Sequence, residues 1–232
     1  MKYFFILLIA VAIISCKKET VENPAAANYY SYFPLSIGNW IIYTVDSIGH
    51  LKDDDLTNET DTSLLIRHYK IKEVVESDFT DGEGRRAFRI TRYKQTNDTL
   101  PWEFLTVWTA NLTLGSAQRV EDNIRYLKLA FPINADVTWN GNAFNDFPEE
   151  DYSYTDIHTS YSMNGFDFDS TLKVLQSDDQ NLIHQIYKEE KYAKNVGMIY
   201  KQKDSLNVYS VNGQIRISNG FEYKETISAF GH

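Results

Sequence analysis

The chain has 232 residues, with 32 acidic side chains against 23 Lys and Arg, for a formal net charge of −9 at pH 7. Such an acidic surface disfavours nucleic acid, whose phosphates need clustered Lys and Arg, and gives no polybasic attraction to anionic lipid. The single cysteine, Cys16, excludes an intramolecular disulfide. At 43% hydrophobic and 14% aromatic residues, the composition is sufficient for a large core.

The N-terminus has the pattern of a lipoprotein signal peptide. Lys2 precedes an apolar run over residues 3–14, which is shorter than the roughly 18 to 20 apolar residues that a membrane-spanning helix needs. The run ends in Ile-Ile-Ser-Cys, which resembles a lipobox. We therefore expect residues 1–15 to be removed and Cys16 to carry diacylglycerol and palmitate. The alternative is an ordinary secretory signal with a cysteine near its cleavage site.

Residues 16–28 are expected to form a lipidated, flexible tether. They combine charge, proline and small residues without helical or strand periodicity. Each buried acyl CH₂ contributes about 0.8 kcal/mol, so the two or three chains of a mature lipoprotein give durable membrane attachment.

Residues 29–232 read as one all-β domain. Short segments rich in aromatic and β-branched residues alternate with Gly, Asn and Asp clusters, and no crossover helix is evident. The predicted strands cover residues 40–48, 64–76, 85–94, 102–109, 124–131, 152–161, 171–176, 182–191, 197–202, 214–218 and 222–230. We expect a meandering antiparallel sheet that curls into a barrel, half-barrel or sandwich to protect its edges.

Alternation within strands predicts one core face and one face toward solvent or a cavity. Leu127 and Leu129, for example, alternate with Tyr126 and Lys128. Asn and Gly, which tolerate positive φ, predict hairpin turns at five places. These are residues 81–84, 140–142, 164–165, 212–213 and 219–220.

Three stretches resemble a group of lipoproteins of unassigned activity from Bacteroidota-type Gram-negative bacteria. They are residues 32–43 (YFPLSIGNWIIY), Phe131-Pro132 with residues 138–142 (TWNGN), and residues 190–200 (EKYAKNVGMIY). The resemblance implies secretion, lipid attachment and a β-rich fold, and it transfers no catalytic residue. Because Lys17 follows Cys16 in place of a retention-type Asp, we expect the outer membrane, with the periplasmic or surface leaflet undecided.

Motifs for catalysis are weak. Residues 82–87 (GEGRRA) match a loose dinucleotide fingerprint, but a strand follows and a hairpin turn is favoured. Ser170 and Lys173 have S-x-x-K spacing, yet on a strand they point to opposite faces, and no K-T-G or G-x-S-x-G motif is present.

Metal motifs are equally weak, and no metal or cofactor is predicted. The five histidines, His50, His68, His158, His184 and His232, are scattered. The acidic turns at residues 53–55 and 167–169 lack the glycine and glutamate positions of an EF-hand loop. The acidic tract over residues 145–156 is expected to be a solvated loop more readily than a cation site.

Aromatic residues are the remaining signal. Trp102, Phe104 and Trp108 fall at even spacing on one predicted strand, so they would share a face that lines a cavity or binds a sugar ring. The plainer interpretation is that a large sheet uses aromatic residues for packing.

Two functions follow as hypotheses. The first is a non-catalytic, membrane-tethered module that binds a hydrophobic ligand, a glycan or another envelope protein. The second is an envelope hydrolase whose site, for instance a carboxylate pair near the acidic tract, is assembled from separate strands. A closed apolar cavity would favour carriage, an open cleft with two carboxylates of raised pKa would favour catalysis, and a structural role would need no large pocket.

Overall fold

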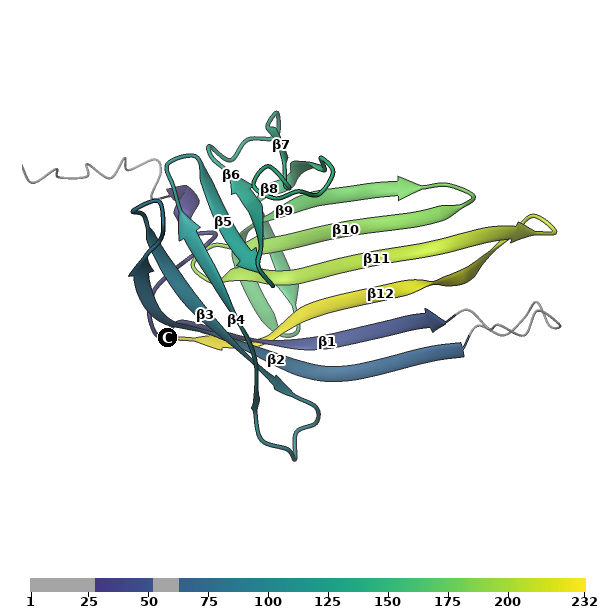
Figure 1. Cartoon of the computed structure of the whole chain (residues 1–232), viewed down its shortest axis with the longest axis horizontal. Helices are drawn as coiled ribbons and strands as arrows, with labels where there is room; N and C mark the ends of the chain where they lie inside the picture. The colour runs from purple at the N-terminus through teal and green to yellow at the C-terminus, as the bar shows by residue number, and fades with distance from the viewer. Residues whose placement is uncertain (1–27, 52–62) are drawn as a thin grey trace, which may run out of the picture.

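The computed structural model describes residues 28–51 and 63–232, which form one twelve-stranded antiparallel sheet in the order β6-β5-β4-β3-β2-β1-β12-β11-β10-β9-β8-β7 (Figure 1). The strands are β1 (Trp40–Leu51), β2 (Ser63–Thr80), β3 (Arg86–Gln95), β4 (Glu103–Leu112), β5 (Ser116–Glu121), β6 (Ile124–Ala130), β7 (Thr138–Asn140), β8 (Asp151–Met163), β9 (Phe166–Gln180), β10 (His184–Ala193), β11 (Gly197–Val211) and β12 (Gln214–Gly231). The predicted all-β meander is confirmed.

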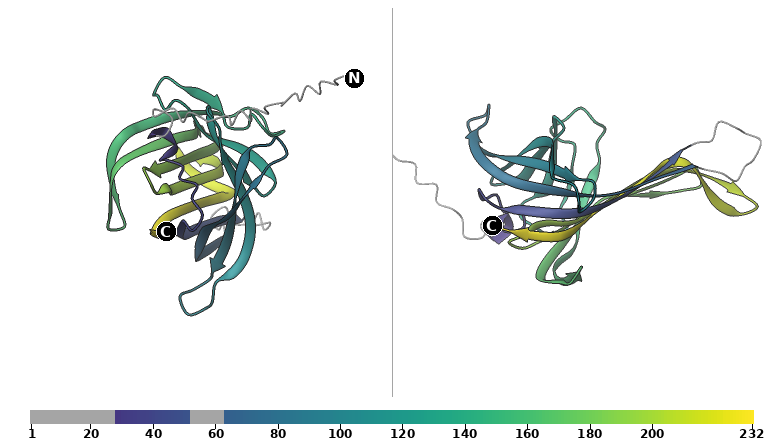
Figure 2. Two further views of the ribbon diagram at one scale, coloured as in Figure 1. Left: turned by 90° about the vertical axis from the view of Figure 1, so that its left-hand side faces the viewer. Right: turned by 90° about the horizontal axis from the view of Figure 1, so that it is seen from below.

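The sheet curls until its two end strands nearly meet, which gives an almost closed barrel (Figure 2, left). At this seam the Leu127 amide of β6 donates a hydrogen bond to the Gly141 carbonyl, with N and O 2.9 Å apart. The Trp139 indole of β7 donates to the Leu127 carbonyl at 3.0 Å. These bonds satisfy groups that an open sheet edge would leave exposed.

The residues before β1 close one end of the barrel. Tyr32 is fully buried and Phe33 is 7% exposed, so both belong to the core. The Tyr32 hydroxyl lies 2.6 Å from Ser170 Oγ and 2.6 Å from His158 Nδ1. The aromatic opening of the domain is thus explained by packing.

Part of the sheet continues beyond the barrel as a twisted extension that is thin when seen edge-on (Figure 2, right). Pairing of β2 with β3 stops at Lys70, and pairing of β8 with β9 stops at Leu175, whereas β1 pairs with β2 as far as Leu51. Only β9, β10, β11, β12, β1 and β2 therefore form the extension.

Two predictions about strands were wrong. β5 and β7 were missed, and the segments predicted as residues 214–218 and 222–230 form the single strand β12. Asn219-Gly220 is not a turn, because it lies inside β12 beside a bulge opposite Asn207 and Val208. Gly220 has φ of +136°, and a Cβ there would lie 2.2 Å from the Ser205 carbonyl oxygen, so a close backbone approach requires glycine.

Three of the other four predicted turns are present as tight turns. Tight turns join β2 to β3 at residues 81–85, β8 to β9 at residues 164–165, and β11 to β12 at residues 212–213. Asn164 and Gly165 both have positive φ, as do Asn212 and Gly213, which is the geometry of tight hairpins. Residues 140–142 begin a hairpin, but its connection is long and spans residues 141–150.

Candidate functional site

Eight charged side chains cross the middle of the barrel, and we call them the ionic layer. They come from seven strands, and none has a side chain more than 16% exposed. Four are acidic and four basic, so their formal charges cancel: Glu73, Glu121, Glu190, Glu225, Arg92, Arg119, Lys128 and Lys201.

The arginine half of the layer is held by paired charges and by an aromatic ring. Arg92 Nε lies 2.9 Å from one carboxylate oxygen of Glu73, and Arg119 Nη2 donates to the other. Arg92 Nη2 also donates to Glu225 Oε1 at 3.0 Å. Both guanidinium groups lie near the face of Trp108, at 3.5 and 4.7 Å from the ring centroid, which adds cation–π attraction.

The lysine half is equally connected. Lys128 Nζ donates to Glu190 and lies 3.2 Å from Glu121 Oε1. Lys201 Nζ lies 3.4 Å from Glu121 Oε2 and 3.6 Å from Glu190 Oε1. The Tyr192 hydroxyl donates to the second oxygen of Glu190 at 2.5 Å, so both oxygens of this fully buried carboxylate are satisfied.

Opposite charges keep these carboxylates ionised despite their burial. Burial alone would raise the pKa of Glu73, but Arg119 and Arg92 outweigh it and the pKa is lowered. Lys128 and Lys201 lower the pKa of Glu121 and Glu190 in the same way. Glu73, Glu121 and Glu190 therefore bind protons more weakly in the folded state than in the unfolded chain.

This makes stability dependent on acid pH. The unfolded carboxylates have pKa values near 4.5, above the folded values, so the ion pairs contribute fully above the unfolded pKa and lose their contribution as pH falls below it. In urea titrations we expect a flat unfolding free energy from about pH 7 to 6 and a steep fall below about pH 5. Equal urea unfolding midpoints at neutral and strongly acidic pH would contradict a stabilising role for the ionised carboxylates.

A polar cavity of about 380 Å³ opens on the lysine side of the layer. Glu121, Lys128, Glu190 and Lys201 form its floor. Its walls come from β6, β8, β9, β10, β11 and the loop over residues 141–150: Tyr126, Asn142, Phe147, Pro148, Glu149, Glu150, Tyr152, Gln176, Lys188 and Lys203. This volume falls within the range of about 300 to 1,000 Å³ typical of small-molecule sites.

The cavity mouth contains an incompletely paired group of side chains. Lys188 Nζ donates to Glu150 Oε1 at 2.5 Å. Gln176 is 8% exposed, and its buried Nε2 has no hydrogen-bond partner within the described part of the chain. The pKa of Lys203 is lowered, first by burial and then by the positive charges of Lys201 and Lys188.

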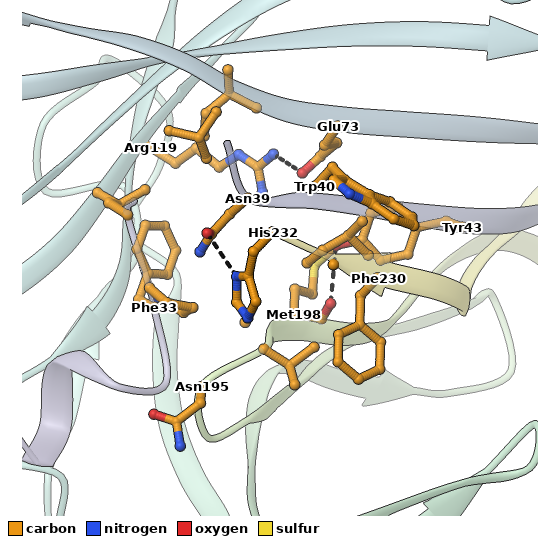
Figure 3. A pocket seen from close by; sticks show the side chains of 18 residues that line it. Phe33, Asn39, Trp40, Tyr43, Glu73, Arg119, Asn195, Met198, Phe230 and His232 are labelled. Carbon is orange, nitrogen blue, oxygen red and sulfur yellow. Dashed lines mark hydrogen bonds and ion pairs between the residues drawn. The ribbon is translucent and has the colours of Figure 1, made fainter. Parts of the chain in front are cut away.

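A second pocket lies on the arginine side of the layer, next to the C-terminus (Figure 3). Its volume is only about 60 Å³, and its lining is largely apolar, with Phe33, Trp40 and Phe230 among the side chains. Asn39 Oδ1 and His232 Nδ1 lie 3.0 Å apart across it, and the Tyr43 hydroxyl donates to the Met198 carbonyl at 2.9 Å. Such a space is large enough for only a few water molecules.

Two outer surfaces also stand out. An open groove of about 490 Å³ separates the β5–β6 turn from the loop at Phe144 and Phe147, but only these two segments line it. The extension exposes apolar side chains, including Leu64, Ile66 and Ile183 at 54%, 53% and 73%.

The structure separates most of the residues that the sequence suggested for catalysis. Cys16 and the acidic turn at residues 53–55 lie outside the described residues. Residues 82–87 form the turn into β3 and its first strand residues, as predicted. Ser170 Oγ bonds to Tyr32, whereas Lys173 Nζ lies 3.5 Å from Asp156, so the S-x-x-K spacing makes no catalytic pair.

The candidate metal ligands are also dispersed. Within residues 28–51 and 63–232, no three His, Cys, Asp or Glu side chains form a metal-binding group. Each histidine has a different partner: His50 with Glu222, His68 with Asp46, His158 with Tyr32, His184 with Asp179 and His232 with Asn39. Asp167 accepts from Ser162, and the neighbouring Phe168 is buried.

The acidic tract over residues 145–156 lies partly at the polar cavity, because Glu149 and Glu150 line it.

The prediction that Trp102, Phe104 and Trp108 share one face is wrong. A bulge at Leu105 changes the register between β3 and β4, so Trp108 points into the barrel while Phe104 pairs with Tyr93 on the outer face and is 64% exposed. Trp102 precedes β4.

The ionic layer was missed, although a signal existed. Glu73 stands two residues from both Ile71 and Val75, and Glu190 stands two residues from Tyr192, so strand periodicity places each acid on a core-facing side. Charged residues at such positions indicate a buried ion network when partners of opposite sign occur on other strands.

No helix in the described part of the chain combines the length and apolar character needed to span a membrane.

No protein-family model matches the chain, and no curated protein matches it significantly. Two solved structures show a loose likeness at 12% identity, each covering 86% of this chain and 98% of its own. One, from Bacteroides fragilis, is provisionally described as an exported protein with a YmcC-like fold (TM-score 0.43), and the other, from Parabacteroides distasonis, provisionally as a lipoprotein (TM-score 0.41).

Proposed function

We propose that this protein is an outer-membrane lipoprotein, anchored through lipid on Cys16, whose barrel binds a polar ligand without catalysing a reaction. The observation that carries the binding role is the polar cavity of about 380 Å³ above the ionic layer. The lipobox-like sequence at residues 13–16 supports the anchor.

The lining of the cavity favours a polar ligand. Four lysines, four glutamates, Asn142 and Gln176 provide hydrogen-bonding groups, while Tyr126 and Tyr152 provide aromatic surface with a polar edge. Of the ligands expected from the sequence, a glycan fits this lining better than a purely hydrophobic molecule, because sugar rings use both kinds of contact.

Acid–base catalysis by the cavity carboxylates is not favoured. A hydrolase of the kind considered above needs a carboxyl group with a raised pKa. In the cavity the pKa values of Glu121 and Glu190 are lowered by Lys128 and Lys201. Asp204 does have a raised pKa, from burial, but it alternates with Lys203 on β11 and so faces away from the cavity.

Native mass spectrometry of the protein purified from its own envelope in a non-ionic detergent tests both parts of the proposal. We expect an acylated mature mass starting at Cys16 and a co-purifying polar ligand. Tyr126→Ala should reduce ligand occupancy at least tenfold, because Tyr126 provides aromatic surface in the cavity wall. Tyr93→Ala is the matched control, because Tyr93 lies on the outer face and bonds to Glu76.

The outcomes separate the two parts. A mature mass without acyl chains would overturn the anchor and leave the cavity untouched. A ligand retained equally by the Tyr126 and Tyr93 variants would place binding elsewhere, and a ligand-free protein after mild purification would contradict the binding function.

A further inference from the structure

The cavity mouth contains a row of hydrogen-bond donors that crosses three neighbouring strands. Lys188 of β10 and Lys203 of β11 are direct cross-strand partners, and the bulge at Gln176 on β9 lies beside Lys188. Direct cross-strand partners share one face of a sheet, and all three side chains line the cavity. Two lysines directly opposite each other repel, so this arrangement is unfavourable without an anion between or beside them.

One lysine in this row already has an anion, and the other does not. Glu150 pairs with Lys188 at 2.5 Å. Among the described residues, the contact of Lys203 is with the Phe221 ring, whose centroid lies 5.6 Å from Nζ, and no carboxylate pairs with it. Partial burial of its ammonium group, and then the charges of Lys201 and Lys188, lower the pKa of Lys203.

Gln176, the third side chain of the row, provides an independent observation, which is a buried amide nitrogen without a partner. Gln176 is 8% exposed, and its Nε2 has no partner in the described part of the chain. An amide nitrogen buried without a partner costs about 1–3 kcal/mol, and a ligand oxygen would remove that cost.

We infer that Lys203, Lys188 and Gln176 form an oxyanion subsite that binds a carboxylate or phosphate group of the ligand. The inference rests on the proposed binding function and specifies its ligand class: a polar molecule with one acidic group. An oxyanion beside Lys203 would accept hydrogen bonds from the ammonium and the amide, and it would compete with Glu150 for Lys188. Charge-assisted bonds of this kind are stronger than neutral ones.

The test is calorimetric titration of the detergent-purified protein at constant ionic strength. Glucuronate represents an acidic sugar, glycerol phosphate represents a lipid headgroup, and glucose is the neutral comparator. We expect saturable binding of at least one acid and at least tenfold weaker binding of glucose. The preferred acid then identifies the source of the anionic group.

The variants isolate the subsite. Lys203→Gln should weaken binding of the acid at least tenfold, while Lys203→Arg, which keeps the charge, should stay within about threefold of the native protein. Lys224→Gln removes the same charge from the opposite face of the adjacent strand and should have no effect. Glu150→Gln should strengthen binding severalfold, because it releases Lys188.

Equal binding of the acid by the Lys203→Gln and Lys224→Gln proteins would overturn the subsite. If the ligand found by native mass spectrometry is neutral and its occupancy is the same in the native and Lys203→Gln proteins, the binding function stands and the oxyanion inference fails. Thermal unfolding of each variant excludes misfolding as the cause. We expect midpoints within a few degrees of the native protein, because Lys203, Lys224 and Glu150 do not belong to the ionic layer.

Discussion

Replacing Glu190 by glutamine is expected to lower the free energy of unfolding by about 3–5 kcal/mol, the cost of leaving a buried charge without its partner. Glu190 is fully buried, and its carboxylate faces both Lys128 and Lys201. The amide would keep the shape of the side chain but leave the two ammonium groups with Glu121 alone. Urea unfolding at pH 7 measures the loss.

Two controls make this result specific to the layer. Glu149→Gln removes an acid of the exposed loop and should change stability by less than about 0.5 kcal/mol. The double variant Glu190→Gln with Lys128→Met should recover part of the loss, because it removes one unpaired charge along with its partner. If the changes in unfolding free energy caused by the two single substitutions sum to that of the double variant, the two residues are not coupled.

The second large effect is expected at the seam. A Cβ at position 141 would lie 2.2 Å from the ring of Tyr152, which is 3% exposed. Gly141→Ala should therefore destabilise the protein by about 3 kcal/mol through overpacking. It should also weaken the bond between the Leu127 amide and the Gly141 carbonyl.

Hydrogen exchange at the Leu127 amide measures the strength of the seam directly. In the Gly141→Ala protein we expect the exchange rate of this amide to rise more than the exchange rates of amides between β1 and β12. Gly115→Ala is the matched control, since a Cβ there meets nothing within 4 Å. Unchanged protection of Leu127 would show that the seam tolerates the methyl group.

The sequence predicted those parts of the fold that follow ordinary patterns. Strands such as β3, where buried Phe88 and Ile90 alternate with the exposed Arg89, were found because one face is apolar. The turns at Asn164 and Asn212 were found because positive φ favours Asn-Gly. The face of β6 with Tyr126 and Lys128 was expected to meet solvent or a cavity, and both residues line the cavity.

The remaining parts depend on contacts between distant strands. β5 escaped prediction because all four of its buried residues, Ser116 to Arg119, are polar or small, as suits a strand that faces an ionic layer. Bulges at Leu105 and Gln176 shift alternation by one residue, and they place Phe104 outside and bring Ser177 opposite Lys188. Neither bulge carries glycine or proline, so local sequence did not reveal it.

The ionic layer also divides the interior of the barrel into two separate spaces. Glu73 and Arg119 line the small end pocket, whereas Glu121, Lys128, Glu190 and Lys201 line the polar cavity, so the two spaces are separated by charge and never join into one apolar channel. Hydrocarbon gains nothing by lying against paired ions, because its favourable transfer requires apolar surroundings. Under the proposed binding function, an amphiphilic ligand would place its polar head in the cavity and leave its tail along the cavity-side face of the extension, where Phe221 and Leu65 are exposed.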